Sequence, residues 1–262
     1  MRLPLYQIDA FAAKPFRGNP AAICPLDRWI DDGLMQAIAA ENNLAETAFF
    51  VAEGGDYRLR WFTPTVEVDL CGHATLASGW LLLNRLAPER GEIVFHTRSG
   101  PLGVRRGDGR LMTMDLPSRP AQPVDPCSGL IEAMGGASPS AILAARDYLL
   151  VYDNEAQVRA LKPDMAALIE TDCFAVCATA PGDDGHDFVS RFFAPAQGIP
   201  EDPVTGSAHC TLAPFWAKRL GKSELKAYQA SARGGELLVA DRGERVELAG
   251  QCALYLEGFI HV

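Results

Sequence analysis

The sequence has 262 residues, of which 48% are apolar and 22% are charged, and this composition is typical of a folded globular protein rather than a disordered one. Its 33 acidic and 24 basic residues give a formal charge of −9, opposite in sign to the basic surface with which proteins bind nucleic acid. At about 150 residues per domain, the length allows one domain or two, and it is ample to bury a hydrophobic core.

Strand patterns dominate the first half of the chain. Short, partly alternating apolar segments are separated there by glycine, proline or aspartate, which is typical of strands. These segments span residues 3–11, 47–53, 57–62, 92–97, 102–106 and 110–116. Helices are predicted at residues 31–42, which two aspartates open, and again after Gly72.

A proline-rich segment at residues 117–126 separates the two halves, because its four prolines disfavour both a helix and an interior strand. We therefore predict an N-terminal lobe, residues 1–117, and a C-terminal lobe, residues 118–262, with the last strand able to return to the first lobe. Helix patterns in the second half begin after Gly206 and, more weakly, at residues 157–161 and 164–170. Its strand patterns span residues 146–152, 173–179, 187–193, 225–230, 236–239, 245–248 and 253–257. Many strands and few helices indicate an α+β fold.

Targeting and metal-binding signals are absent from the sequence. The N-terminus lacks the charged and then apolar segments of a signal peptide, and no apolar run reaches the roughly 20 residues of a membrane span. The 7 scattered cysteines favour a reduced, cytoplasmic protein. Because no CxxC, HxxxH or HExxH spacing occurs, no metal is expected. The dinucleotide, P-loop and serine-hydrolase motifs are missing as well.

Two parts of the chain repeat one pattern. The arm Arg-Trp-Phe-Thr-Pro at residues 60–64 matches Arg-Phe-Phe-Ala-Pro at residues 191–195. The segments that begin at Gly72 and Gly206 also match, and both pass from small residues to large apolar ones before an Arg-Leu pair. A helix that is apolar all round is a buried helix. We therefore predict a duplicated unit in which the buried helix leaves its first amides free to bind an anion such as a carboxylate.

Polar side chains stand at both predicted helix starts. Cys71 and His73 lie at the first start, and Asp202 and Ser207 lie at the second. Each could be a helix cap or a surface residue, but the recurrence of polar groups at the same place favours a function. Glu46 opens a strongly apolar strand. In an apolar cleft, desolvation would raise the pKa of Glu46 and let it shuttle protons, whereas in an exposed connection it would remain an ordinary carboxylate.

Five motifs, in order along essentially the whole chain, resemble those of the PhzF family, the phenazine-biosynthesis PhzF-like proteins. They are Phe-Arg-Gly-Asn-Pro-Ala-Ala at 16–22, Asn-Leu-Ala-Glu-Thr-Ala-Phe at 43–49, Phe-Thr-Pro at 62–64, Cys-Gly-His-Ala-Thr-Leu at 71–76 and Glu-Asp-Pro-Val-Thr-Gly-Ser-Ala at 201–208. The resemblance implies a diaminopimelate-epimerase-like fold. That fold has two pseudo-symmetric lobes, each a curled, mostly antiparallel sheet around a central helix, with the active site in the cleft between them.

Roles for single residues follow from this resemblance. Glu46 matches the family's acid/base glutamate, and the polar partners of that glutamate are matched by His73, Asp202 and Ser207. The carboxylate of a small substrate would be held by the amides of Gly72, His73, Gly206 and Ser207. Family members are typically homodimers and need no cofactor. The best-understood member isomerises a dihydro-hydroxyanthranilate by moving a proton between carbons.

The leading hypothesis is a cofactor-independent isomerase in which Glu46 moves a proton between two carbons of a small carboxylate. Related epimerases and racemases use two cysteines, one from each lobe. Here Cys71 has no second thiol to match it, because Pro203 and Val204 occupy the place before Thr205. The alternatives are an epimerase or racemase that uses Glu46 with Cys71, and a protein that binds a small ligand without catalysis.

Overall fold

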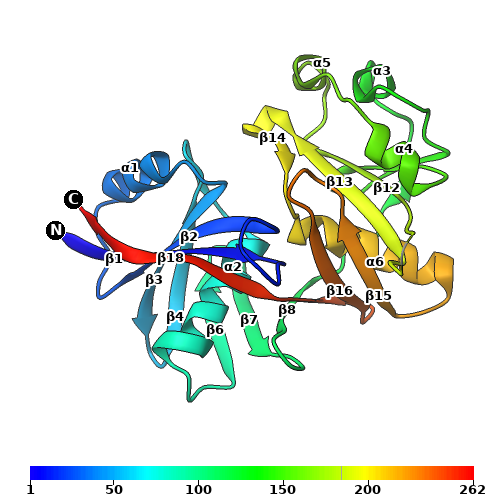
Figure 1. The fold of residues 1–262 in the computed structure, drawn as a ribbon. Coiled ribbons are helices and arrows are strands. Elements are labelled where there is room, and N and C mark those ends of the chain that lie inside the picture. The colour runs from blue at the N-terminus through cyan, green and yellow to red at the C-terminus, as the bar shows by residue number, and fades with distance from the viewer. Residues whose placement is uncertain (184) are drawn as a thin grey trace. The chain divides into compact units, whose positions relative to one another are not determined.

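The computed structural model describes residues 1–183 and 185–262, which form two compact units (Figure 1). The first unit contains Met1–Asp115 and Leu248–Val262, and the second contains Leu116–Glu247. The two ends of the chain therefore belong to the same unit. In the described part of the chain, no helix is both long enough and apolar enough to cross a membrane.

The first unit is a mixed sheet with two main helices. Its strands are β1 (Arg2–Ala10), β2 (Asn19–Leu26), β3 (Glu46–Glu53), β4 (Asp56–Phe62), β5 (Glu67–Val68), β6 (Glu92–Thr97), β7 (Gly100–Arg106), β8 (Met112–Pro117), which ends at the unit boundary, and β18 (Cys252–His261). The helices are α1 (Asp32–Asn42) and α2 (Gly72–Leu81), and α2 continues into the π-helix η1 (Leu82–Leu86). The strands predicted from the first half are confirmed, whereas β2 was not predicted.

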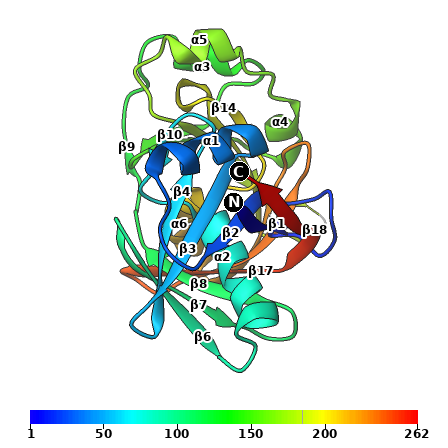
Figure 2. The same ribbon diagram turned by 90° about the vertical axis from the view of Figure 1, so that its left-hand side faces the viewer.

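The two main helices of the first unit are crossover connections between parallel strands. Antiparallel pairs join β18 to β1, β1 to β2, β3 to β4, β6 to β7 and β7 to β8. The pairs β2–β3 and β4–β6 are parallel, so a crossover is needed between their strands, and α1 and α2 supply it. Because β1 pairs with β18 from Arg2 opposite His261 onward, the N- and C-termini lie side by side (Figures 1 and 2).

The sheet of the first unit curls around α2. This helix contacts strands near both ends of the sheet, β18 and β7, as well as β1, β2 and β3. It is buried continuously from Gly72 to Gly79, as its apolar sequence predicts. Gly79 is required for this packing, because a Cβ at that position would lie 2.4 Å from Cγ1 of Val104 on β7.

Helix α1 begins where the sequence predicts. The Asp31 carboxylate accepts a hydrogen bond from the Leu34 amide at 3.2 Å and so caps the first turn. The buried residues of α1 form one cluster with residues of β2, β3 and β4. Its members are Met35, Ile38, Ala39, Cys24, Leu26, Phe49 and Phe62.

The second unit contains more and shorter elements. Its strands are β9 (Gln122–Pro123), β10 (Ala141–Ala144), β11 (Tyr148–Val151), β12 (Val176–Pro181), β13 (Phe188–Ala194), β14 (Ile199–Asp202), β15 (Glu224–Gln229), β16 (Gly235–Asp241) and β17 (Arg245–Gly250), whose end crosses the unit boundary. Its helices are α3 (Leu130–Met134), α4 (Glu155–Ala160), α5 (Met165–Ile169), the 3-10 helix η2 (Pro195–Gln197) and α6 (Gly206–Leu220). The sequence did not predict β10 or α3.

The second unit repeats the pairing pattern of the first. The pairs β11–β12 and β13–β15 are parallel, like β2–β3 and β4–β6, and β12–β13 is antiparallel, like β3–β4. Helix α6 makes the same crossover as α2. The arms match in detail as well: Arg60 donates to both carboxylate oxygens of Glu67 at 2.7 and 2.8 Å, and Arg191 donates to both of Glu201 at 2.7 and 3.0 Å. The predicted duplication is thus visible in the topology and in a repeated ion pair.

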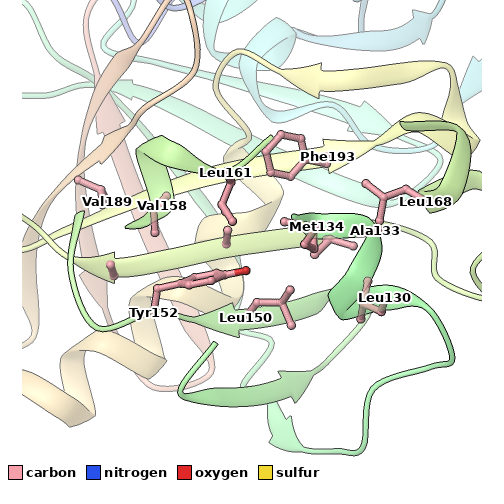
Figure 3. Packing of buried hydrophobic residues seen from close by; sticks show 13 residues of the cluster. Leu130, Ala133, Met134, Leu150, Tyr152, Val158, Leu161, Leu168, Val189 and Phe193 are labelled. Carbon is pink, nitrogen blue, oxygen red and sulfur yellow. The ribbon is translucent and has the colours of Figure 1, made fainter. Parts of the chain in front are cut away.

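One hydrophobic cluster holds the short helices of the second unit against its strands. Figure 3 shows side chains from α3, α5, β11 and β13 pointing into a common core. The buried members are Leu130, Ala133, Met134, Leu150, Tyr152, Val158, Leu161, Leu168, Val176, Ala178, Ala180, Val189 and Phe193. Burial also raises the pKa of the Tyr152 hydroxyl to about 12, so this residue acts as a neutral core side chain.

Helix α6 contains a proline in its interior, and the carbonyl that this proline leaves without a helical partner is hydrogen-bonded from elsewhere. Pro214 has no N–H to donate to the carbonyl of Cys210, one turn earlier. The amide of Arg119, in the proline-rich segment, donates to that carbonyl at 2.9 Å instead. On β13, Phe188 stacks on Trp216 of α6 with ring centroids 5.7 Å apart. These contacts fix α6, and with it the helix start that carries Ser207.

Candidate active site

Glu46 and His73 meet in the first unit. Glu46 is the first residue of β3, and His73 is the second residue of α2. Their side chains are 10% and 6% exposed, and Oε2 of Glu46 lies 3.2 Å from Nε2 of His73. The parallel β2–β3 pairing places Glu46 beside Ala21, next to the strand on which α2 packs. The structure therefore brings together two of the predicted site residues that are 27 positions apart in the sequence.

The protonation state of His73 follows from its partners. Asn19, at the start of β2, has its amide nitrogen 3.2 Å from Nδ1 of His73, and an amide nitrogen can only donate. Nδ1 is therefore the acceptor, and the ring proton lies on Nε2, toward Glu46. Burial lowers the pKa of His73 to about 3, so the imidazole is neutral near pH 7. The site thus presents a buried carboxylate next to a neutral N–H donor.

Cys71 is the N-cap residue of α2 and completes a group of three. Its Sγ lies 3.5 Å from Nδ1 of His73, and its side chain is buried. Ligand-type atoms of Glu46, Cys71 and His73 all lie within 4.8 Å of one another, which makes these residues a possible metal-binding set. No side chain caps the helix, because the Cys71 side chain makes no cap hydrogen bond. The first amides of α2 thus have no partner within the helix.

In the second unit, Asp202 belongs to a buried hydrogen-bond network. Thr205 donates its hydroxyl hydrogen to Oδ2 of Asp202 at 2.5 Å. Gln229, which is fully buried at the end of β15, accepts from the Thr205 amide at 2.8 Å. The Gln229 amide donates to the Asp202 carbonyl at 2.8 Å and to the Thr205 hydroxyl at 3.1 Å. Gln229 therefore joins the end of β14 to the start of α6.

Ser207 lies on the first turn of α6, beside a cation. Nη2 of Arg146 lies 3.3 Å from the Ser207 hydroxyl. The guanidinium also bonds both carboxylate oxygens of Asp147 and lies 4.9 Å from the centre of the Phe174 ring. The Arg146–Asp147 ion pair thus lies beside the start of α6, with the guanidinium on the side of Ser207.

The N-cap residues of the two long buried helices correspond to each other. Cys71 before α2 and Thr205 before α6 both have extended backbone angles, and neither caps its helix with its side chain. Thr205, and not Pro203 or Val204 as the sequence suggested, therefore occupies the position equivalent to Cys71. The conclusion about thiols is unchanged, since a threonine hydroxyl stands where the second thiol of a two-cysteine enzyme would be.

His209 belongs to the core and not to the polar face of α6. It is fully buried, its Nδ1 lies 2.8 Å from the Thr205 carbonyl, and its ring packs near Phe188. Burial lowers the pKa of His209 to about 4, so Nδ1 carries the proton and donates it to that carbonyl. His209 therefore supports the loop that holds Asp202 without exposing a titrating group.

Sequence reasoning missed three residues that surround the candidates. Asn19 lies inside a recognised motif, yet nothing in that motif indicated a contact with His73. In the sequence of β15, polar Glu224 and Lys226 alternate with apolar Leu225 and Ala227, and this alternation places Gln229 on the inward face, so a signal for it was present. Arg146 lies in the turn between β10 and β11, and because β10 was not predicted, this turn was not predicted either.

Comparison with known proteins agrees with the fold and the motifs. The family model described as PhzC-PhzF, phenazine biosynthesis-like protein, matches residues 8–258. A Pseudomonas aeruginosa protein named as an uncharacterized isomerase is 53% identical over 262 residues, covering 100% of both chains. A crystal structure of a PhzF-family phenazine biosynthesis protein from Enterococcus faecalis has a TM-score of 0.96 at 42% identity, covering 100% of both chains. A hydroxyproline epimerase from Agrobacterium vitis, covering 99% of this chain and 92% of its own, shares the fold alone, with a TM-score of 0.61 at 11% identity. The predicted α+β, diaminopimelate-epimerase-like fold is confirmed.

Proposed function

Because the chain belongs to the PhzC-PhzF family of phenazine biosynthesis-like proteins, we propose that it is a cofactor-independent isomerase whose Glu46 moves a proton between two carbons of a small carboxylate. An isomerase-type enzyme is supported by relatives that carry the name isomerase and by the fold shared with an epimerase. The single observation that carries the assignment is the buried contact between Glu46 Oε2 and His73 Nε2, at 3.2 Å.

The acid/base role falls to Glu46 because of its surroundings. A carboxylate at the start of an apolar strand is poorly solvated, and a neutral imidazole beside it adds no charge that would hold it ionised. Glu46 can take a proton from one carbon, become a neutral acid whose proton exchanges with solvent, and deliver a proton to a second carbon. His73 Nε2 lies 3.2 Å from the Glu46 carboxyl, and Asn19 holds the imidazole in the tautomer that carries its proton on that nitrogen.

The substrate class follows from the two helix starts. Neither α2 nor α6 has a side-chain cap, so the amides of Gly72, His73, Gly206 and Ser207 are the groups available to an anion. We assign these amides to a substrate carboxylate, and Asp202 and Ser207 to further polar contacts with the substrate. The −9 charge of the chain does not oppose this assignment, because local amides do the binding.

One observation favours a second candidate, an epimerase or racemase that pairs Glu46 with Cys71. The Cys71 thiol lies 3.5 Å from His73 Nδ1, so it belongs to the same buried group of side chains as Glu46. The lack of a thiol at Thr205, the equivalent N-cap position, speaks against the usual two-cysteine form of this chemistry. The isomerase with a single carboxylate therefore remains the leading proposal.

Proton exchange in heavy water tests the proposal. The full chain is incubated in heavy water with a dihydro-hydroxyanthranilate or trans-4-hydroxy-L-proline, and deuterium in the carbon skeleton is followed by proton NMR and mass spectrometry. We expect incorporation at one carbon with the wild type and none with Glu46→Gln. Glu41→Gln, an exposed glutamate on α1, is the matched control and should exchange at the wild-type rate. Full exchange in Glu46→Gln would overturn the assignment, and loss of exchange in Cys71→Ser alone would favour the epimerase.

A further inference from the structure

The connection between β10 and β11 carries an arginine that reaches the start of α6. Nη2 of Arg146 lies 3.3 Å from the hydroxyl oxygen of Ser207, although the two residues are 61 positions apart in the sequence. A guanidinium can only donate hydrogen bonds, so the Ser207 oxygen is the acceptor in this contact. We propose that Arg146 is a positioning residue, which donates to the Ser207 oxygen and so leaves the hydroxyl hydrogen of Ser207 to donate to the substrate. This role deepens the proposed function and rests on it, because it treats Ser207 as a substrate contact.

The Arg146 side chain is held in place by two neighbours. Its Nε and Nη2 donate to the two carboxylate oxygens of Asp147, each at 2.8 Å, and its guanidinium carbon lies 4.9 Å from the centre of the Phe174 ring. The Asp147 side chain is 11% exposed, against 36% for Arg146. A bidentate ion pair and a ring contact fix the plane of a guanidinium more firmly than a single hydrogen bond does. With one hydrogen of Nη2 directed to Asp147, the other is directed to Ser207.

The Ser207 hydroxyl keeps its own hydrogen for another group. Among residues 1–183 and 185–262, this hydroxyl makes no hydrogen bond other than the contact with Arg146. Ser207 is also partly exposed, whereas its neighbours in the sequence, residues 204–206 and 208–210, are all buried. A ligand donor would approach the oxygen beside a positive guanidinium, but a ligand acceptor meets the free hydrogen. The arrangement therefore selects an acceptor, such as a carboxylate or carbonyl oxygen of the substrate.

The duplication supports this role, because the first unit makes the same contact with other residues. Asn19, which follows the β1–β2 connection, has its amide nitrogen 3.2 Å from Nδ1 of His73. His73 is the second residue of α2, as Ser207 is of α6. The pairs β1–β2 and β10–β11 are both antiparallel, and each leads into a parallel pair. In each unit, a donor from this part of the frame engages the acceptor atom at the helix start, so the side chain there presents its hydrogen elsewhere.

An ion pair that only stabilises the β10–β11 connection is the alternative role for Arg146. In that case Asp147 is the functional partner of the guanidinium, and the contact with Ser207 is incidental. The two roles predict different results when the guanidinium is removed. A positioning role predicts a changed chemical environment at position 207 and weaker substrate binding, whereas a local ion pair predicts a change in stability alone.

A thiol placed at position 207 tests the contact without any substrate. In the Ser207→Cys chain, a guanidinium that donates to this side chain stabilises the thiolate and lowers the pKa of the thiol. That pKa is obtained from the rate of iodoacetamide alkylation against pH, with the modified peptide identified by mass spectrometry. Adding Arg146→Gln should raise the pKa of the introduced thiol by about 1 unit. The matched control is Arg242→Gln, which should leave it unchanged, because Arg242 pairs with Glu224 after the C-terminal end of α6. An equal pKa with and without Arg146 would overturn the proposal.

The exchange assay in heavy water tests whether this positioning serves the reaction. Ser207→Ala and Arg146→Gln should each raise the substrate concentration for half-maximal exchange about 3–10-fold, as expected for one hydrogen bond, with little change in the rate at saturation. The double variant should bind no more weakly than Ser207→Ala, because Arg146 acts through that hydroxyl, and Arg146→Lys should recover part of the loss because it keeps a donor.

Additive losses in the double variant would contradict a role through Ser207. If the wild type exchanges neither probe, the isomerase assignment fails on its own. The pKa of the introduced thiol then still decides whether Arg146 acts on position 207, so the two failures are distinguishable.

Discussion

Replacing Gln229 with leucine removes the side chain that links β14 to α6 while nearly preserving its volume. The glutamine accepts from the Thr205 amide and donates to the Asp202 carbonyl, each at 2.8 Å, and all three residues are buried. Leucine leaves that amide and that carbonyl without their partner. A buried backbone group left unsatisfied costs about 1–3 kcal/mol, so two such groups predict destabilisation of about 2–6 kcal/mol.

The measurement has to report on the second unit, because all three residues lie there. Hydrogen exchange under increasing urea, read by mass spectrometry on peptides from β15 and the first turns of α6, gives the local free energy of opening. The control is Gln157→Leu, which loses a 2.9 Å hydrogen bond from the Asp153 amide in an exposed turn. That variant should lose less than about 1 kcal/mol, because water replaces the glutamine. Equal effects of the two substitutions would refute the reasoning.

Three further outcomes are expected, each measured by urea unfolding. Burial lowers the pKa of His209 from 6.5 to about 4, so the unfolded chain binds a proton in this window that the folded chain does not. Stability is therefore lost as the pH falls from 6.5 to 4, and His209→Asn should remove about 3 kcal/mol of that loss, since each pKa unit is worth about 1.4 kcal/mol; an unchanged acid profile would contradict this. Gly79→Ala should cost about 1–3 kcal/mol, because its Cβ would meet Val104, and Val104→Ala should lessen the extra cost; a stable Gly79→Ala would be the contrary result. Glu67→Gln and Glu201→Gln should lower the free energy of unfolding to a similar extent, because each breaks the same kind of bidentate ion pair. A large difference between the two variants would mean that the ion pairs of the two repeats contribute unequally to stability.

Much of the fold could be predicted from the sequence, because hydrophobic patterns and an internal repeat mark its main elements. The buried helices are apolar on every side, and the aromatic arms end in proline, so both copies could be recognised. Two of the missed elements, β10 and α3, lack such signals. β10 is four residues of alanine, isoleucine, leucine and alanine, and α3 is a five-residue helix, and neither is long enough for a periodic pattern to separate helix from strand.

The sequence was sufficient to predict which residues belong to the candidate site, but not which of them are in contact. Motifs pointed to Glu46 and His73, but the 3.2 Å approach between them depends on the β2–β3 register and on the packing of α2. The Asn19–His73 contact spans 54 positions and is set by the same packing. Local patterns carry no information on such distances, because the tertiary structure and not the neighbouring sequence determines them. The alignment of Cys71 with Thr205 likewise became clear only from the helix starts.

Duplication and divergence in this chain act on different residues. Both halves keep the arginine–glutamate arm, the parallel crossover and the uncapped buried helix, which are the parts that build a frame. The chemical groups differ: β3 begins with Glu46 where β12 begins with the buried Val176, and the helix starts carry Cys71 and Thr205. A mechanism with matched acid and base needs the same kind of group in both halves. The repeated frame with unlike groups therefore supports the proposed chemistry with one carboxylate, Glu46.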